Sequence, residues 1–237
     1  MFFSDPANPE RDVLVTGIGL VTPLGIGSDV SFRQLLSGAT AGRLLTPDDI
    51  DHFHELQALL KRVPGGAPAD ASAARDFVQE YLRTEGTPVL RHHRGKPLSA
   101  GVADDEDLLN IITMAAAAEA VQQSGLSTAH LQTEIAGCVI GTSKASLRSL
   151  ETRHLLNFAD SPLQAVRRLW ALAGPAFSPV AACATGLVSV LHGSLLIHSG
   201  ACEICLVGSA DASVRASVLA SFHRLGVTSN HPDPATA

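Results

Sequence analysis

Short apolar runs alternate with longer helix-like segments along most of this chain. The runs are partly β-branched and have lengths typical of buried strands, at 13–18, 135–141, 176–182 and 204–207. Apolar residues at helical spacing predict helices over 29–36, 107–124, 144–157, 160–173 and 184–198. This alternation of strand and helix predicts an α/β domain with mostly parallel strands.

Capping residues support two of these helices. Ser28 is the predicted N-cap of the helix over 29–36, and Gly38 is its predicted stop. Gly125 follows the Ala-rich helix over 107–124, and glycine is common directly after a helix. We therefore expect both helices to end close to these residues.

The helix over 184–198 differs from the others because it is apolar nearly all round, with small residues at Gly186, Ser189, Gly193 and Ser194. A helix without a polar face is buried on every side. We therefore expect this helix to lie between two sheets.

Residues 39–106 interrupt the alternation. They contain five of the prolines, the pair Gly65–Gly66 and much of the charge. We predict an excursion over the surface, with short helices near 48–61 and 71–83. His92 and His93 lie within it and are interpreted as a solvated loop, because no further metal ligands accompany them. No metal site is predicted.

Composition narrows the class of protein. The chain has 237 residues, 46% hydrophobic and 17% charged, which is enough for a large core. A net charge of −6 without a basic run argues against nucleic acid and anionic membranes as partners. No apolar stretch reaches the roughly 18 residues of a membrane span, and the N-terminus has no signal-peptide pattern. We expect a cytoplasmic protein with free thiols.

Cys183 carries the strongest chemical signal. It lies between the predicted strand 176–182 and the predicted helix 184–198. Backbone N–H groups at the start of a helix lack partners within it and carry the positive end of its dipole, which stabilises a thiolate. Most free cysteines are instead buried as small hydrophobes. Around Cys183, however, only small residues occur, which leaves room for a substrate: Ala181, Ala182, Ala184, Thr185 and Gly186.

The other three cysteines are interpreted as packing residues. Cys202 and Cys205 have the spacing of a redox pair, but they open a strand rather than a helix. We therefore expect their side chains on opposite faces of the sheet. Cys138, within the predicted strand 135–141, is assigned the same packing role.

The helix after Cys183 supplies no base for it. His192 lies on the far face, about 13 Å along the helix axis, and His198 lies further still. Both are interpreted as packing or capping residues. The sequence therefore predicts a nucleophile, but it identifies no residue as the general base for that nucleophile.

The sequence carries no cofactor signal. Gly17 and Gly19 resemble the start of a dinucleotide fingerprint, but Thr22 stands where the third glycine belongs. The acidic residue expected about 20 residues further on is also missing. We interpret the two glycines as a turn after the first strand and predict no cofactor.

Four segments together resemble the β-ketoacyl-acyl carrier protein synthases, the condensing enzymes of fatty acid and polyketide synthesis. The segments are 13–25, 182–186, 205–211 and 222–234. Their order and spacing agree with the family over about 11–237, and 43–106 fits least well. The motif Ala-Cys-Ala-Thr at 182–185 favours the elongating type of these synthases.

The resemblance implies a thiolase-like layered αβαβα sandwich and a homodimer. Residues 11–237 would then be an incomplete N-terminal ketosynthase domain that follows a tail of residues 1–10, with 43–106 as a variable surface excursion. The resemblance also implies that Cys183 takes an acyl group from the phosphopantetheine of acyl carrier protein. Decarboxylation of a malonyl-thioester and a Claisen condensation would follow. The backbone N–H of Cys183 would be the first donor to the oxyanion.

The remaining catalytic groups of the family, two histidines, a lysine and a second oxyanion donor, belong to a C-terminal half that this sequence does not include. We therefore expect this chain to need that complementary half. Two alternatives stay open. In the first alternative, the chain is a non-catalytic partner of a complete ketosynthase, although such partners typically have another residue in place of the cysteine. In the second alternative, the chain is an inactive truncated fragment.

Overall fold

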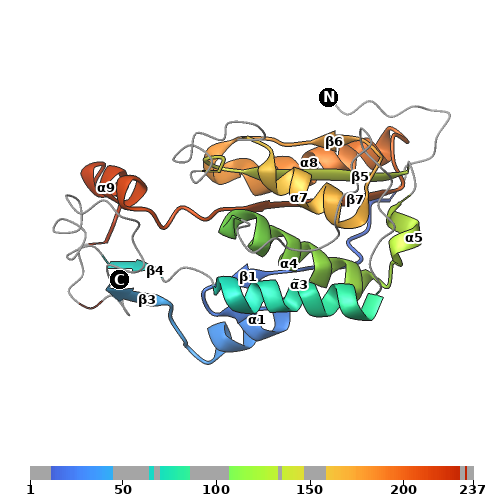
Figure 1. Cartoon of the computed structure of the whole chain (residues 1–237). Helices are drawn as coiled ribbons and strands as arrows, with labels where there is room; N and C mark the ends of the chain where they lie inside the picture. The colour runs from blue at the N-terminus through green and yellow to red at the C-terminus, as the bar shows by residue number, and fades with distance from the viewer. Residues whose placement is uncertain are drawn as a thin grey trace. The chain divides into compact units, whose positions relative to one another are not determined.

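Three parallel strands form the sheet on which the predicted motifs lie (Figure 1). They are β5 (Ala136–Thr142), β6 (Ala176–Phe177) and β7 (Ile204–Ala210), in the order β6-β5-β7. β5 and β7 pair along their whole length. Every residue of the central strand β5 is buried. The predicted parallel α/β arrangement is confirmed.

The computed structural model describes residues 12–44, 64–66, 70–85, 107–132, 135–146, 159–229 and 233. The chain divides into two units. Unit 1 comprises Met1–Gly19 and Arg75–Asp211, and unit 2 comprises Leu20–Ala74 and Ala212–Ala237. The sheet and Cys183 belong to unit 1. No helix among the described residues is both long and apolar enough to cross a membrane.

Two crossover helices cover the sheet in unit 1. α7 (Ser161–Trp170) leads from β5 to β6, and α8 (Thr185–His198) leads from β6 to β7. Crossovers between parallel strands are right-handed, and these two run in opposite directions across the sheet. The two helices therefore lie on opposite faces (Figure 1). α4 (Leu108–Ser124) packs against α7 and also contacts β7.

The ends of α4 are close to those predicted. Asp107 is the N-cap, and its carboxylate accepts a hydrogen bond from the Leu109 N–H at 3.3 Å. Gly125 ends the helix in the left-handed conformation, with φ of 68°. The short helix α5 (Thr128–Leu131) follows, capped by the side chain of Ser127.

The predicted helix over 71–83 is confirmed as α3 (Ala71–Glu85). Its Tyr81 packs edge-to-face on Trp170 of α7, with ring centroids 5.8 Å apart. The indole N–H of the fully buried Trp170 donates to the Tyr81 hydroxyl at 3.0 Å. The aromatic pair therefore buries its apolar surface without leaving the indole donor unsatisfied.

Cys138, Cys202 and Cys205, the sheet cysteines, are all free thiols, as is Cys183. The prediction that Cys202 and Cys205 point to opposite faces is wrong. A Cβ built on Gly137 would lie 3.1 Å from the Cys202 sulfur and 3.4 Å from the Cys205 sulfur, so both lie over one face. The reason is that Cys202 precedes β7, where strand alternation does not apply.

Burial makes the sheet cysteines poor nucleophiles. It raises the pKa of the Cys138 thiol to about 12, against a small opposing effect of Arg167. Burial also raises the pKa of Cys205, and to a lesser extent that of Cys202. Cys138 and Cys202 are each only 1% exposed. These properties support the packing role predicted for the three residues.

The predicted strand over 13–18 is not formed; residues 12–20 contain no strand. Their backbone instead runs against α4. A Cβ on Gly17 would lie 1.9 Å from the Ala120 carbonyl oxygen, and one on Gly19 would lie 1.7 Å from the Ala116 carbonyl oxygen. Gly17 and Gly19 are therefore required by this close approach, rather than by the turn we predicted.

The prediction that the apolar helix is buried on every side is also wrong for this structure. On α8, the residues Thr185, Ser189 and Gly193 are buried, and α8 packs on β5 and β7. The large residues point away, and Leu187 is 75% exposed. Small residues let the helix approach the sheet closely, which leaves its bulky side chains on the outer face.

The described residues of unit 2 include two short antiparallel strand pairs, two complete helices and the start of α3. β1 (Val21–Thr22) pairs with β2 (Gly25–Ile26), and β3 (Gly42–Leu44) pairs with β4 (Pro64–Gly66). The helices are α1 (Ser28–Leu36) and α9 (Ala216–Arg224). Ser28 is the first helical residue of α1 and not its N-cap, which is Gly27. Gly38 has the positive φ, 78°, expected after a helix.

Two further predictions differ from the structure in part. The strand expected over 176–182 ends at Phe177, and Ala182–Ala184 forms a 3-10 helix, η2. The helix expected over 144–157 does not include 144–146, and 147–157 lie outside the described residues. The helix near 48–61, the pair His92–His93 and the tail 1–10 lie outside them as well.

Candidate active site

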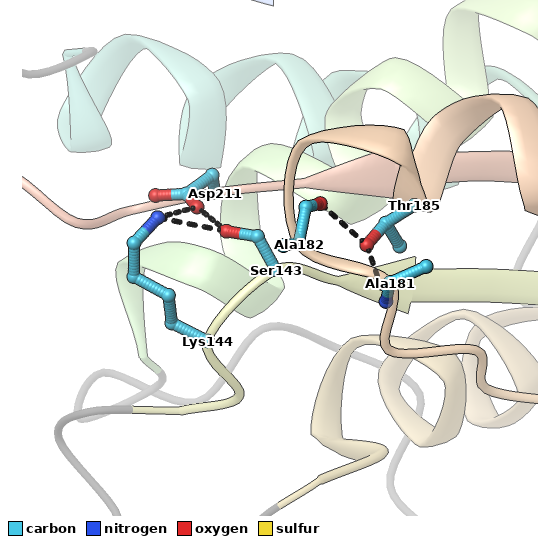
Figure 2. A network of polar contacts seen from close by, with 6 residues as sticks. All are labelled: Ser143, Lys144, Ala181, Ala182, Thr185 and Asp211. Atoms are coloured by element: carbon cyan, nitrogen blue, oxygen red, sulfur yellow. Dashed lines mark hydrogen bonds and ion pairs between the residues drawn. The ribbon is translucent and has the colours of Figure 1, made fainter.

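Cys183 lies in the middle of η2, directly before α8, as expected for a residue at a strand-to-helix turn. The turn is held by Thr185, which is only 2% exposed. Its hydroxyl donates to the Ala182 carbonyl at 2.7 Å and accepts from the Ala181 N–H at 3.0 Å (Figure 2). One buried side chain therefore fixes the backbone on both sides of the turn.

The backbone of this turn is strained. Ala182 has φ of 48°, in the left-handed region that residues with a Cβ rarely adopt. The turn also lies close to β5. A Cβ on Gly141 would lie 2.2 Å from the Pro179 carbonyl oxygen and 2.5 Å from the Thr185 methyl group. A glycine at 141 is therefore needed to bring the cysteine turn next to the strand end.

The carboxyl ends of β5 and β7 place a polar group beside this turn. Thr142 pairs with Ala210 at the ends of the two strands, so the next residues, Ser143 and Asp211, leave the sheet side by side. The Asp211 carboxylate accepts hydrogen bonds from the Ser143 hydroxyl and, at 2.9 Å, from the Lys144 ammonium (Figure 2). Lys144 also donates to the Ser143 hydroxyl oxygen at 2.9 Å.

A cavity of about 340 Å³ lies between the cysteine turn and this polar group. One side is formed by the cysteine turn and the start of α8, and the other by residues at the carboxyl ends of β5 and β7. The lining residues are Ala182, Cys183, Thr185, Gly186, Ser143, Lys144, Ser209, Ala210 and Asp211. Ligands of parallel α/β sheets bind outside the carboxyl ends of the strands, where this cavity lies.

Cys183 is exposed and lines this cavity, so its sulfur is not enclosed by bulky aliphatic residues. The two histidines of α8 do not line it. His192 is exposed, and its ring makes an edge contact with Phe177, with centroids 6.5 Å apart. His198, at the last position of α8, is exposed too. The structure therefore agrees that neither histidine is placed as a base for Cys183.

Sequence reasoning missed Ser143, Lys144 and Asp211. Their signal was present, because they directly follow the two longest strands of a parallel sheet, at the edge where such sheets bind ligands. Among the described residues, no group of three or more His, Cys, Asp and Glu side chains is arranged to hold a metal ion.

The family model "Beta-ketoacyl synthase, N-terminal domain" matches residues 10–237. The chain belongs to this family. It is 25% identical over 233 residues to 3-oxoacyl-[acyl-carrier-protein] synthase 2 of Rhizobium meliloti (strain 1021), covering 90% of this chain and 49% of that protein. It is 26% identical to the tetracenomycin polyketide synthase ketoacyl synthase alpha subunit of Streptomyces glaucescens, covering 96% and 52%.

Solved structures show the same fold. The ishigamide ketosynthase/chain length factor superposes with a TM-score of 0.63 at 22% identity, covering 94% of this chain and 52% of that one. A β-ketoacyl synthase from Burkholderia phymatum STM815 gives 0.64 at 18% identity, covering 94% and 52%. A type II polyketide ketosynthase in complex with its acyl carrier protein gives 0.63 at 18%, covering 92% and 49%.

The expected fold class is therefore confirmed: the mixed helices and sheet correspond to the N-terminal half of a thiolase-like fold. The chain spans about half the length of the curated relatives that it matches. Cys183, the candidate nucleophile of the sequence analysis, lines the cavity at the carboxyl ends of the strands.

Proposed function

We propose that this chain carries the nucleophile of a β-ketoacyl synthase and that Cys183 accepts an acyl group from acyl carrier protein. The observation that supports this most is the position of Cys183, exposed in the cavity at the N-terminus of α8. Membership of the family supplies the reaction type. The relatives named above include synthases of both fatty acids and polyketides, and the choice between the two pathways stays open.

In the proposed acyl transfer, the Cys183 thiolate attacks the carbonyl carbon of the carrier's thioester. The new sulfur–carbon bond forms, and the oxyanion of the tetrahedral intermediate accepts a hydrogen bond from the backbone N–H of Cys183, the first donor that the family resemblance implies. The bond to the carrier sulfur then breaks, and the phosphopantetheine thiolate leaves and takes a proton. A soft thiol nucleophile is suited to this step because it is also a fair leaving group.

The second stage would be a decarboxylative Claisen condensation with a malonyl-thioester. By the family resemblance, the residues that promote it belong to the C-terminal half of a ketosynthase, whereas this sequence matches the N-terminal domain. We propose that the complete site forms when the residues of this sequence are combined with such a half, within a homodimer of ketosynthases in the cytoplasm, where its four free thiols stay reduced.

Transfer from a radiolabelled acyl-acyl carrier protein tests the proposal. The wild-type chain should take up label, alone or with a candidate C-terminal polypeptide. Cys183→Ala should take up none, because no other thiol lines the cavity. Cys205→Ala is the matched control and should keep the label. Uptake that is equal in the wild type and in Cys183→Ala would overturn the proposal, and so would no uptake under any condition.

A further inference from the structure

Cys202 and Cys205 have the spacing of a redox pair, and their sulfur atoms lie together in the structure. A Cβ built on Gly137 of β5 would lie 3.1 Å from the Cys202 sulfur and 3.4 Å from the Cys205 sulfur. The two side chains therefore converge on one point, as the geometry of a disulfide requires. This arrangement removes the objection that strand alternation would separate the two thiols.

A bend in the chain before β7 brings the two cysteines together. The N–H groups of Glu203 and Ile204 both donate to the Ile135 carbonyl, at 2.8 and 3.2 Å. In an extended strand successive residues face opposite ways, so two neighbouring donors on one acceptor mark a bend. Cys202 lies directly before the bend, and Cys205 is the second residue of β7. The backbone of the folded chain therefore sets the approach of the two thiols.

Two glycines leave the space that the sulfur atoms fill. Gly137 is the partner of Cys205 in the register of β5 and β7. On the helix that packs over β7, a Cβ built on Gly193 would lie 3.3 Å from the Cys205 sulfur. Neither of these neighbours places a side chain between the two thiols.

The surroundings of the pair make its oxidation slow and restrict the oxidant. Burial raises the pKa of both thiols, and a hydrogen bond between them lowers the pKa of Cys202 and raises that of Cys205 further. Cys202 is almost fully buried, whereas Cys205 keeps part of its surface exposed. A small oxidant is therefore needed, and hydrogen peroxide meets this requirement.

We propose that Cys202 and Cys205 form an oxidation site at which a peroxide produces an intrachain disulfide. The thiolate of one cysteine attacks an oxygen atom of the peroxide, the O–O bond breaks, and a sulfenic acid and water are formed. The second thiol loses its proton and attacks that sulfur. The S–S bond forms, the S–O bond breaks, and the departing hydroxide takes up the proton as water. One peroxide is thereby reduced to two water molecules, and the two thiols together lose two electrons.

This site is separate from the candidate nucleophile. Cys183 precedes α8 and Cys202 follows it, and the 14 residues of α8 span about 21 Å. Two cysteines whose Cα atoms are more than about 7 Å apart cannot be bridged without movement of the backbone. Cys183 is therefore not expected to form a disulfide with either member of the pair. The inference does not depend on the proposed acylation of Cys183.

Proteolysis after glutamate tests the proposal, because Glu203 lies between the two cysteines. The native chain is treated with hydrogen peroxide, the remaining thiols are blocked with N-ethylmaleimide in denaturant, and the chain is cleaved after its glutamates. The peptides that contain Cys202 and Cys205 should stay joined and should separate on reduction. Cys183 shares a peptide with Cys202, so tandem mass spectrometry of the joined peptides assigns the disulfide to one of these two residues.

Four variants complete the test. Cys202→Ala and Cys205→Ala should each lose the joined peptides. Cys138→Ala removes a buried thiol of the same sheet, and Cys183→Ala removes the exposed thiol. Both of these controls should keep the joined peptides.

Two outcomes would overturn the oxidation site. One is a folded wild-type chain that gives no joined peptides after prolonged treatment with excess peroxide. The other is a disulfide that tandem mass spectrometry assigns to Cys183 and Cys205 in the wild type, an assignment that holds even where a variant fails to fold. Neither outcome affects the proposed acylation of Cys183, which is measured without peroxide.

Discussion

The turn at Cys183 and the sheet cysteines carry the same functional group in opposite surroundings. Cys183 is exposed in a cavity at a helix N-terminus, among small residues. Cys138 and Cys202 are buried in the sheet region, and burial raises the pKa of each. The difference shows that the exposure of a thiol in this fold, and the room around it, depend on where a strand ends and a helix begins.

Native-state alkylation should give the largest contrast. With a pKa of about 12 instead of the ordinary 9.0, Cys138 holds about a thousandfold less thiolate near neutral pH, and its burial also blocks the reagent. Iodoacetamide should therefore modify Cys183 first and Cys138 much more slowly, as measured by peptide mass mapping. In denaturant all four thiols should react at similar rates. Native labelling of Cys138 as fast as that of Cys183 would contradict the contrast.

The buried thiol should also make stability depend on pH. Because the pKa of Cys138 is raised on folding, its contribution to stability is complete below about pH 9 and is lost as the pH rises toward 12. The midpoint of urea unfolding should fall over this window. Cys138→Ala should flatten the fall, whereas Val139→Ala, a buried neighbour that does not titrate, should keep it. Equal slopes in the two variants would be evidence against the raised pKa.

Thr185 tests what holds the exposed cysteine in place. Thr185→Val keeps the shape of the side chain but leaves the Ala181 N–H and the Ala182 carbonyl without their hydroxyl partner. We expect a loss of about 1–3 kcal/mol in the free energy of unfolding and slower acylation of Cys183. Thr185→Ser retains the hydroxyl and should lose less. Wild-type stability and acylation in Thr185→Val would show that the hydroxyl does not support the turn.

The smallest expected effect concerns the strain before Cys183. Ala182→Gly removes the Cβ from a residue with φ of 48°, and should raise the free energy of unfolding by about 0.5–1 kcal/mol. Ala184→Gly is the matched control, because Ala184 has an ordinary φ of −88°. That substitution should lower stability by about the same amount. The account of strain fails if both substitutions shift the unfolding midpoint in the same direction.

The apolar runs predicted the three strands of the parallel sheet, of which β6 is shorter than expected, and helical spacing predicted the crossover helices α7 and α8. The prediction succeeded where several signals in the sequence agree, namely the hydrophobic period, the capping residues and the small residues. These places are strand Ala136–Thr142, helix Leu108–Ser124 and the turn at Cys183. The run at 13–18 misled us because an apolar extended segment becomes a strand only where another strand pairs with it. Here the backbone of Gly17 and Gly19 packs on a helix instead.

Two other features needed the three-dimensional arrangement. The adjacency of Lys144 and Asp211 depends on the register of β5 and β7, which pairs Thr142 with Ala210 across 67 residues of sequence. The outward direction of Leu187 depends on which face of α8 meets the sheet, and an all-round apolar helix gives no periodic signal for that choice. Neither the adjacency of the two side chains nor the outward direction of Leu187 can be predicted from composition and periodicity.

Locating the acyl group after incubation with an acyl-acyl carrier protein tests the central claim most directly. The chain is digested, and the peptide that carries the added mass is identified by tandem mass spectrometry. We predict one acyl group, bound as a thioester to Cys183. An acyl group on Cys205 or Cys202, or a chain that carries none when a complementary C-terminal half is also present, would contradict the claim that Cys183 is the nucleophile.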